Sequence, residues 1–156
     1  MLIRIIAIGN KMPSWIETGF REYAKRFTDR CLLELHEIPA EKRGKNADIP
    51  KIIQQEGEKI LKIIKPDHRI IALDVKGQSW NTDELAAHLN HWQQEGRHID
   101  LLIGGPDGLS TACLQKAELK WSLSPLTLPH PLVRIILVEQ LYRAESILKN
   151  HPYHRK

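Results

Sequence analysis

The sequence predicts an α/β fold with one largely parallel sheet, and three observations support this prediction. Short apolar runs typical of buried strands alternate along the chain with segments that carry apolar residues at helical spacing. The chain is 156 residues long, which suits one domain with a single core. Its hydrophobic content of 42% and charged content of 27% are typical of a globular protein. We therefore expect one domain over residues 1–156.

The first half of the chain predicts two strands and two helices. Residues 3–8 are rich in β-branched side chains, as in a buried strand, and a helical apolar pattern follows over residues 16–27. Residues 32–38 alternate between apolar and polar side chains, which indicates a second strand. Asp48 is placed to cap the next helix, with Pro50 in its first turn. The apolar stripe of that helix comprises Ile49, Ile52, Ile53, Ile60 and Leu61.

The second half repeats the alternation of strand and helix, which favours parallel strands joined by helical crossovers. In chain order we expect a strand at 69–75, a turn at 76–79, a helix from Asn81 or Thr82 to Gly96, a strand at 99–105, a short helix from Ser110 to Leu119, an extended run at 121–128 and a last helix at about 132–150.

The last helix is apolar on more than one side. One arc holds Val133, Leu137, Leu141, Ala144 and Leu148. Outside that arc lie Ile135, Ile136, Val138, Tyr142 and Ile147. A helix of this kind is either deeply buried or part of an interface. We favour a homodimer interface over a fully internal helix.

Three strand ends are candidates for a shared ligand pocket. In a parallel sheet the ligand lies outside the carboxyl ends of the strands, and Leu73-Asp74, Gly104-Gly105 and Leu126-Leu128 follow such ends. The stretch LLIGGPDGLS matches neither of the common phosphate-binding glycine loops. Two interpretations remain: an ordinary turn between strand and helix, or a bare backbone that lets a flat, mostly uncharged ligand such as an adenosine approach.

Three further features each have two interpretations. The basic loop at residues 42–45 is either solvated surface or a phosphate contact. The terminal HPYHRK is either a frayed end or a segment in which Tyr153 stacks on a base while His154 and Arg155 touch phosphate or base. His130, held between two prolines, is either a turn residue or a proton-transfer group, since imidazole titrates near a pKa of ~6.5.

Charge and cysteine usage limit the class of protein. The net charge of +4 permits a nucleic-acid partner without requiring one. No apolar run approaches the ~20 residues of a membrane helix and the amino terminus resembles a strand rather than a signal peptide, so we expect a cytoplasmic protein with no membrane partner. Cys31 and Cys113 lack metal-ligand spacing, so we expect reduced thiols and no metal. We expect the tryptophans mainly in the core: Trp15, Trp80, Trp92 and Trp121.

Four segments together resemble one known family. They are IPAEKRGKNADI, LLIGGPDGLS, WSLSPLTLPHPLVRIILVEQLYRA and the terminal NHPYHR. The chain resembles the family H pseudouridine N3-methyltransferases of large-subunit ribosomal RNA, which are small members of the trefoil-knot (SPOUT) methyltransferases. The likeness extends from GNKMPSWIETGFREYAKRF to the last residues, and LTLPHPLVR with NHPYHR is its most specific part.

The resemblance implies a trefoil knot formed by roughly residues 100–156, an obligate homodimer and S-adenosylmethionine (SAM) as cofactor. It implies methyl transfer to N3 of a pseudouridine in 23S rRNA within the ribosome, on a stem-loop that faces the small subunit. The implied cofactor-binding residues are Leu73, Gly104, Gly105, Leu123, Ser124, Pro125, Leu126, Thr127 and Leu128. The chain departs from the family pattern with Pro125 in place of alanine and Asp107 in place of glutamate.

This chemistry requires a methyl donor in line with the nucleophile, loss of the N3 imide proton and a grip on the RNA. We assign His130 or His154 to proton removal or base orientation, and Arg134, Tyr153 and Arg155 to nucleotide positioning across a dimer interface. The expected phosphate contacts are Lys42, Arg43 and Lys45. Two alternatives to this function stay open: the protein is a non-catalytic RNA-binding dimer on the same scaffold, or it is an α/β enzyme that acts on a small metabolite.

Overall fold

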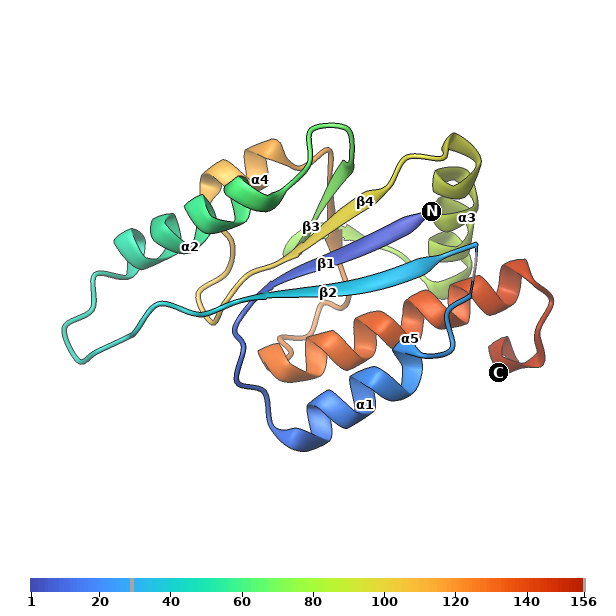
Figure 1. Cartoon of the computed structure of the whole chain (residues 1–156), viewed down its shortest axis with the longest axis horizontal. Helices are drawn as coiled ribbons and strands as arrows, with labels where there is room; N and C mark the ends of the chain where they lie inside the picture. The colour runs from blue at the N-terminus through green and yellow to red at the C-terminus, as the bar shows by residue number, and fades with distance from the viewer. Residues whose placement is uncertain (29, 156) are drawn as a thin grey trace.

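A computed structural model describes residues 1–28 and 30–155 as a five-stranded parallel sheet with helices on both faces (Figure 1). The strand order is β2-β1-β4-β3-β5, so the predicted α/β class with a parallel sheet is confirmed. The elements are β1 (Leu2–Ile8), α1 (Ser14–Ala24), β2 (Leu32–Ile38), α2 (Ile49–Ile63), β3 (Arg69–Ser79), α3 (Thr82–Glu95), β4 (Ile99–Ile103), α4 (Thr111–Lys116), β5 (Leu119–Ser122), α5 (His130–Leu148) and the 3₁₀ turn η1 (Pro152–His154).

The central strand β1 shows why the strand sequences are apolar throughout. Ile3, Ile5 and Ala7 belong to the core shared with α1, α3 and α5. Ile6 and Ile8 belong to a second core shared with α2 and α4. Because helices cover both faces of the sheet, both sets of alternating side chains are buried. Within the described part of the chain, no helix combines the length and apolarity needed to cross a membrane.

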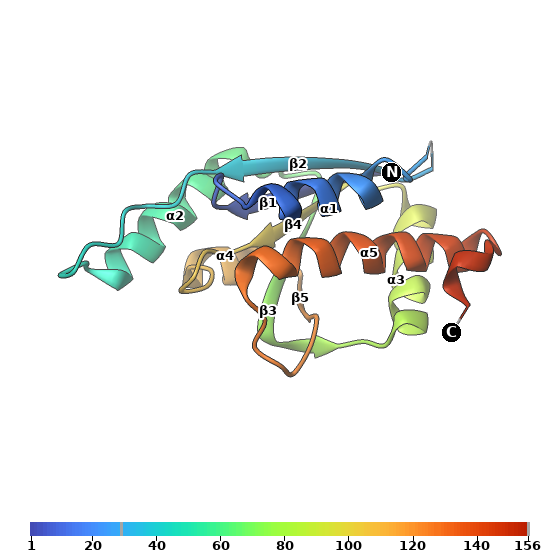
Figure 2. The ribbon, with the colours of Figure 1, turned by 90° about the horizontal axis from the view of Figure 1, so that it is seen from below.

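Helix α5 packs against α1 and α3 on one face of the sheet (Figures 1 and 2). Val138, which we expected outside the core arc, is fully buried. Ile135 packs against Gly19 of α1, where an added Cβ would lie 3.0 Å from its Cδ1 atom. The Tyr142 ring lies edge-on to Phe27, with 6.0 Å between ring centroids. Much of the second apolar side of this helix therefore packs against other parts of the same chain. The homodimer stays a prediction.

The predicted turn at residues 76–79 is wrong, because β3 continues to Ser79. Leu73 and Gln78 are both opposite Trp121 of β5, so the four residues between them bulge out of the ladder. A glycine-containing polar stretch suits such a bulge as well as it suits a turn, and bulges are frequent next to active sites.

The predicted extended run at residues 121–128 is wrong beyond Ser122. The Ser122 hydroxyl donates to the Ser124 carbonyl at 3.0 Å, and the Leu126 N–H donates to the Ser124 hydroxyl at 3.0 Å. Side-chain hydroxyls that bond to nearby backbone groups compete with the sheet ladder. The chain therefore leaves the sheet and forms a loop before α5.

Three helices and one strand differ from their predicted ends. Helix α1 spans Ser14–Ala24 rather than residues 16–27, and β4 ends at Ile103 rather than at Gly105. Helix α4 ends at Lys116 rather than Leu119, because the chain becomes extended and enters β5. Helix α5 begins at His130, with Pro131 in its first turn, and ends at Leu148 instead of spanning 132–150. A proline in the first turn removes an N–H that has no partner inside the helix, so an earlier start costs little.

The tryptophans and thiols agree with the predictions except at one position. Trp92 and Trp121 are each 2% exposed and belong to the core. Trp15, at the start of α1, is 58% exposed, so its assignment to the core is wrong. Cys31 and Cys113 are buried free thiols, as expected.

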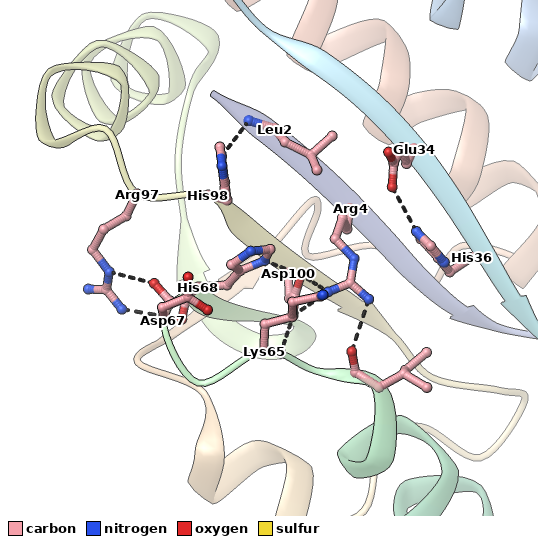
Figure 3. Close-up of polar contacts among 11 residues, drawn as sticks. Leu2, Arg4, Glu34, His36, Lys65, Asp67, His68, Arg97, His98 and Asp100 are labelled. Atoms are coloured by element: carbon pink, nitrogen blue, oxygen red, sulfur yellow. Dashed lines mark hydrogen bonds and ion pairs between the residues drawn. The ribbon is translucent and has the colours of Figure 1, made fainter.

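A buried polar cluster lies at the amino end of the sheet (Figure 3). Asp100 of β4 is fully buried and pairs with Arg4 of β1, with 3.2 Å between Oδ1 and Nη1. Asp100 also lies 2.9 Å from His68 Nδ1 and accepts the Lys65 N–H at 2.9 Å. Arg4 donates to the Ile63 carbonyl at the end of α2 at 2.9 Å. The cluster fastens α2 to this end of the sheet and lies away from the carboxyl ends of the strands.

Helices α2 and α4 approach each other at Gly57. A Cβ atom there would lie 2.7 Å from Ser110 Cβ, and Ser110 caps α4 by accepting the Cys113 N–H at 3.2 Å. We expect Gly57→Ala to lower the free energy of unfolding by about 2 kcal/mol, because it overpacks this contact and displaces the cap. Denaturant unfolding measures the change. Gly44→Ala is the control, since nothing lies within 4 Å of a Cβ there. Equal stabilities of the two variants would contradict the prediction.

Candidate active site

A cavity of about 700 Å³ opens at the carboxyl ends of β3, β4 and β5. Its volume lies within the range of small-molecule sites, roughly 300–1,000 Å³. Figure 2 shows the loop between β5 and α5 beside the end of β3. Leu73-Asp74, Gly104-Gly105 and Leu126-Leu128 all line the cavity. The predicted convergence of these strand ends is therefore confirmed.

The glycine pair after β4 forms a tight turn and one wall of the cavity. A Cβ atom on Gly104 would lie 2.5 Å from the carbonyl carbon of Gly108 and 2.7 Å from the Leu109 nitrogen. The Gly108 N–H donates to the Gly105 carbonyl at 3.0 Å, and Gly108 has a φ of +86°. Backbone packs directly on backbone here, which only glycine permits. The stretch is thus both a strand-to-helix turn and a bare pocket wall.

The bulge of β3 forms a second wall with a carboxylate. Asp74, Val75 and Lys76 line the cavity. Gly77 packs on β5, because a Cβ there would lie 2.6 Å from the Lys120 carbonyl carbon. Asp74 accepts the Lys76 N–H at 3.2 Å and has no ion-pair partner within the residues that the structure describes. Val75 and Lys76 were missed because a glycine-containing polar stretch predicts a turn, which would not face a pocket.

The loop after β5 forms the apolar wall. Leu126 is 72% exposed at the mouth of the cavity. Pro125 does not line the cavity and is exposed. The other eight residues that the resemblance implied for the cofactor do line it: Leu73, Gly104, Gly105, Leu123, Ser124, Leu126, Thr127 and Leu128.

His130 begins α5 and lines the cavity. Burial lowers the pKa of its imidazole, and the positive charge of Arg134 lowers it further. The ring is therefore neutral near pH 7. Its Nε2 atom is buried with no hydrogen-bond partner among the described residues, and it would lie 3.6 Å from a Cβ on Gly9. This nitrogen faces the end of β1.

Arg134 lies outside the cavity and is 2% exposed. Its Nη1 atom pairs with Glu37 Oε2 at 2.6 Å, and its Nη2 atom donates to the Gly9 carbonyl at 2.6 Å. Arg134 thus joins α5 to the ends of β1 and β2. Its two bonds hold the guanidinium beside these strand ends and outside the cavity.

The carboxyl-terminal segment lies at the other end of α5 (Figure 2). The Tyr153 hydroxyl donates to Glu139 Oε1 at 3.1 Å, while His154 is half-buried and Arg155 is exposed. Glu139 lies nine residues, or about 14 Å along α5, from His130, and no residue of the tail lines the cavity. The structure therefore does not bring Tyr153, His154 or Arg155 to the cavity of the same chain.

The three cations of the basic loop between β2 and α2 differ in exposure. Lys42 and Lys45 are exposed. Arg43 is half-buried and pairs with Asp107 at 2.8 Å and with Glu56 at 2.9 Å. Asp107 lines the cavity, so Arg43 connects the basic loop to the glycine turn. A basic sequence motif does not reveal that one of its cations is half-buried between two acidic side chains.

The cavity combines apolar side chains and exposed backbone with the charged side chains of Asp74, Lys76 and Asp107. Asp107 pairs with Arg43, whereas Asp74 has no ion-pair partner within the described residues. Three leucines form the apolar side, namely Leu123, Leu126 and Leu128. Among residues 1–28 and 30–155, no group of three or more His, Cys, Asp or Glu side chains is arranged to hold a metal ion. The lining suits an organic ligand that has a flat apolar part and a positive charge.

Comparison with known proteins places the chain in a family. Three solved structures share the fold. A protein from Haemophilus influenzae described as a methylase has 14% sequence identity and a TM-score of 0.56 over 99% of this chain and 70% of its own, and one from Neisseria gonorrhoeae, also described as a methylase, has 14% identity and a TM-score of 0.50 over 90% of this chain and 81% of its own. A protein from Legionella pneumophila described as a methyltransferase and solved with SAM bound has 12% identity and a TM-score of 0.51 over 93% of this chain and 66% of its own. A family model described as "predicted SPOUT methyltransferase" matches residues 1–154. The protein therefore belongs to the SPOUT methyltransferase family.

Proposed function

We propose that the protein is a SAM-dependent methyltransferase that acts as a homodimer on N3 of a pseudouridine in 23S rRNA within the ribosome. Family membership supports methyl transfer. The SAM bound to the Legionella protein of the same fold supports the cofactor. The RNA substrate rests on the resemblance of LTLPHPLVR and NHPYHR. The observation that carries the proposal is the cavity at the strand ends, which eight of the nine expected cofactor residues line.

The lining of the cavity fits SAM. The bare Gly104 turn leaves room for a flat ring against the backbone, and the leucines of the loop after β5 provide an apolar surface. Asp74 supplies a negative charge without a bound cation, which favours a positively charged ligand. When bound, SAM supplies an electrophilic methyl group.

The acceptor nitrogen must lose its imide proton, so a neutral base at the cavity is useful. The lowered pKa of His130 keeps its imidazole unprotonated and able to accept a proton. We propose His130 as the base or orienting group on the cavity wall, with His154 as the second candidate. Arg134, one helical turn along α5 and held by Glu37 and Gly9, contributes its positive charge to the lowered pKa of His130.

The separation between tail and cavity supports a composite site. If two copies pack with their α5 helices antiparallel about a twofold axis, the tail of one chain lies beside the His130 end of its partner. The exposed Trp15 lies at the start of α1 and provides apolar surface for such an interface. We propose that Tyr153 anchors the tail to α5 through Glu139, while His154 and Arg155 face the RNA at the partner's cavity.

The exposed Lys42 and Lys45 are the proposed phosphate contacts of the basic loop. Each phosphate contact adds to the salt dependence of RNA affinity, because binding releases counterions from the RNA. A net charge of +4 on a small domain is consistent with a modest number of such contacts.

Two measurements test the proposal. Titration calorimetry with SAM and with S-adenosylhomocysteine is expected to show binding with at most one site per chain. Methyl transfer from labelled SAM is then measured on free rRNA, large subunits and whole ribosomes, and the modified base is mapped. We expect one methylated pseudouridine, and no product on ribosomes that carry uridine at that position. Salt-sensitive RNA binding without cofactor binding would favour an RNA-binding dimer, and cofactor binding without any RNA dependence would favour a small-metabolite enzyme.

A further inference from the structure

We infer that Arg43 is a positioning residue for the cofactor pocket and not a phosphate ligand. Together with the buried carboxylate of Glu56, it holds Asp107 and thereby fixes the Gly104–Gly108 turn. This inference rests on the proposed binding of SAM in the cavity. It assigns the three cations of the basic loop to two different tasks.

The guanidinium of Arg43 donates hydrogen bonds to three residues. Its Nε atom donates to Asp107 Oδ2 at 2.8 Å. Its Nη1 atom donates to Glu56 Oε2 at 3.0 Å and to the Glu41 carbonyl at 3.1 Å, and its Nη2 atom donates to Glu56 Oε1 at 2.9 Å. The fork-like pairing with Glu56 is the geometry that arginine provides and lysine does not. The side chain is thus held in one orientation.

Glu56 makes this orientation rigid. It lies on α2, is 2% exposed, and also accepts the Glu41 N–H at 3.0 Å. A buried carboxylate needs a cation and hydrogen bonds to offset its lost hydration. Within the described residues, Arg43 is the cation that pairs with it. Releasing Arg43 to a phosphate would leave the Glu56 charge buried and uncompensated.

The glycine turn of the pocket contacts this ion pair at two points. Asp107 is bonded to it directly. A Cβ on Gly105 would lie 3.3 Å from Arg43 Nη2 and 3.3 Å from Glu56 Oε1, so the turn backbone lies against the pair. The tip of the turn at residues 106–108 is exposed, and beyond the hydrogen bond from Gly108 to Gly105 this ion pair is what holds it. Its shape therefore depends on this external hold, and a preorganised loop binds its ligand more tightly.

The neighbouring lysines differ from Arg43 in both exposure and pairing. Lys42 and Lys45 are exposed, and neither has an acidic partner within the part of the chain that the structure describes. They are free to meet phosphate, whereas Arg43 is paired with Glu56 and Asp107. The pair of lysines therefore offers a matched control on the same loop.

The test compares three kinds of variant by calorimetry with SAM alone. We expect Arg43→Lys and Asp107→Asn each to bind SAM about tenfold more weakly, because each loosens the turn. Asp107→Glu keeps the carboxylate and is expected to bind SAM within about twofold of wild type. The double variant Lys42→Ala with Lys45→Ala is expected to keep SAM affinity and to lose RNA affinity.

A second readout needs no ligand. Amide hydrogen exchange of the ligand-free protein is expected to quicken at residues 104–108 in Arg43→Lys, while the core strands stay protected. Thermal unfolding confirms that each variant is folded at the assay temperature. SAM affinity and loop exchange equal to wild type in both Arg43→Lys and Asp107→Asn would overturn the inference. So would a loss of RNA affinity in Arg43→Lys with SAM affinity intact. Failure of wild type to bind SAM, with loop exchange altered as expected, would overturn the proposed function and leave Arg43 as the support of the turn.

Discussion

Gly104→Ala is expected to weaken SAM binding up to about 100-fold, since overpacking costs about 1–3 kcal/mol and about 1.4 kcal/mol is a factor of ten in affinity. The added Cβ would lie 2.5 Å from the Gly108 carbonyl carbon, whereas ordinary contacts begin near 3.4 Å. The turn must open by roughly 1 Å to relieve the clash. Rotation of a side chain cannot relieve this clash, because the opposing atoms belong to the main chain. Titration calorimetry of the variant measures the loss.

Gly105→Ala is the matched comparison for this experiment. A Cβ there would lie 3.1 Å from Ile8 Cγ2 and 3.3 Å from Arg43 Nη2, so movements of a few tenths of an ångström relieve these contacts, far less than Gly104 requires. We expect a loss of SAM affinity no greater than about tenfold. Circular dichroism and thermal unfolding establish that both variants are folded. If the two variants bind SAM equally well, the Gly104 turn is not the wall against which the cofactor lies.

The location of the site was predictable from the sequence because it follows from strand direction. Leu73-Asp74, Gly104-Gly105 and Leu126-Leu128 each follow an apolar run, and parallel strands end at the same edge of a sheet. No knowledge of side-chain packing was needed for this step. The homodimer and the knot at about residues 100–156 remain predictions.

The details of the walls were not predictable because they depend on contacts between distant segments. The stretch containing Gly77 has the composition of a turn, yet the backbone of β5 holds it in the sheet as a bulge. A basic loop is usually solvated, and the inward orientation of Arg43 depends on Glu56, which lies 13 positions away on α2. Asp100 sits in an apolar run, and its partner Arg4 is 96 positions away. Sequence periodicity reports on local burial and carries no information about such pairs.

The composite site predicts that two inactive variants restore methyl transfer when they share a dimer. One variant is Gly104→Ala, which has an intact tail and a damaged cavity. The other ends at Asn150, which removes Tyr153, His154 and Arg155 but leaves the cavity intact. Each variant alone is expected to have almost no methyl transfer to ribosomes, because neither homodimer has a cavity and a tail that are both intact.

Mixing the two chains separates the two possible arrangements of the tail. Random pairing makes half of the dimers mixed, and a mixed dimer in which tails cross has one complete site out of two, so about a quarter of wild-type activity is expected. If the tail served the cavity of its own chain, no chain in the mixture would hold both parts, and activity would stay absent. Differently tagged chains purified in succession show that mixed dimers have formed. We expect the crossed arrangement, because Tyr153 is anchored at Glu139, nine residues or about 14 Å along α5 from His130, and in this position the tail does not line the cavity of its own chain.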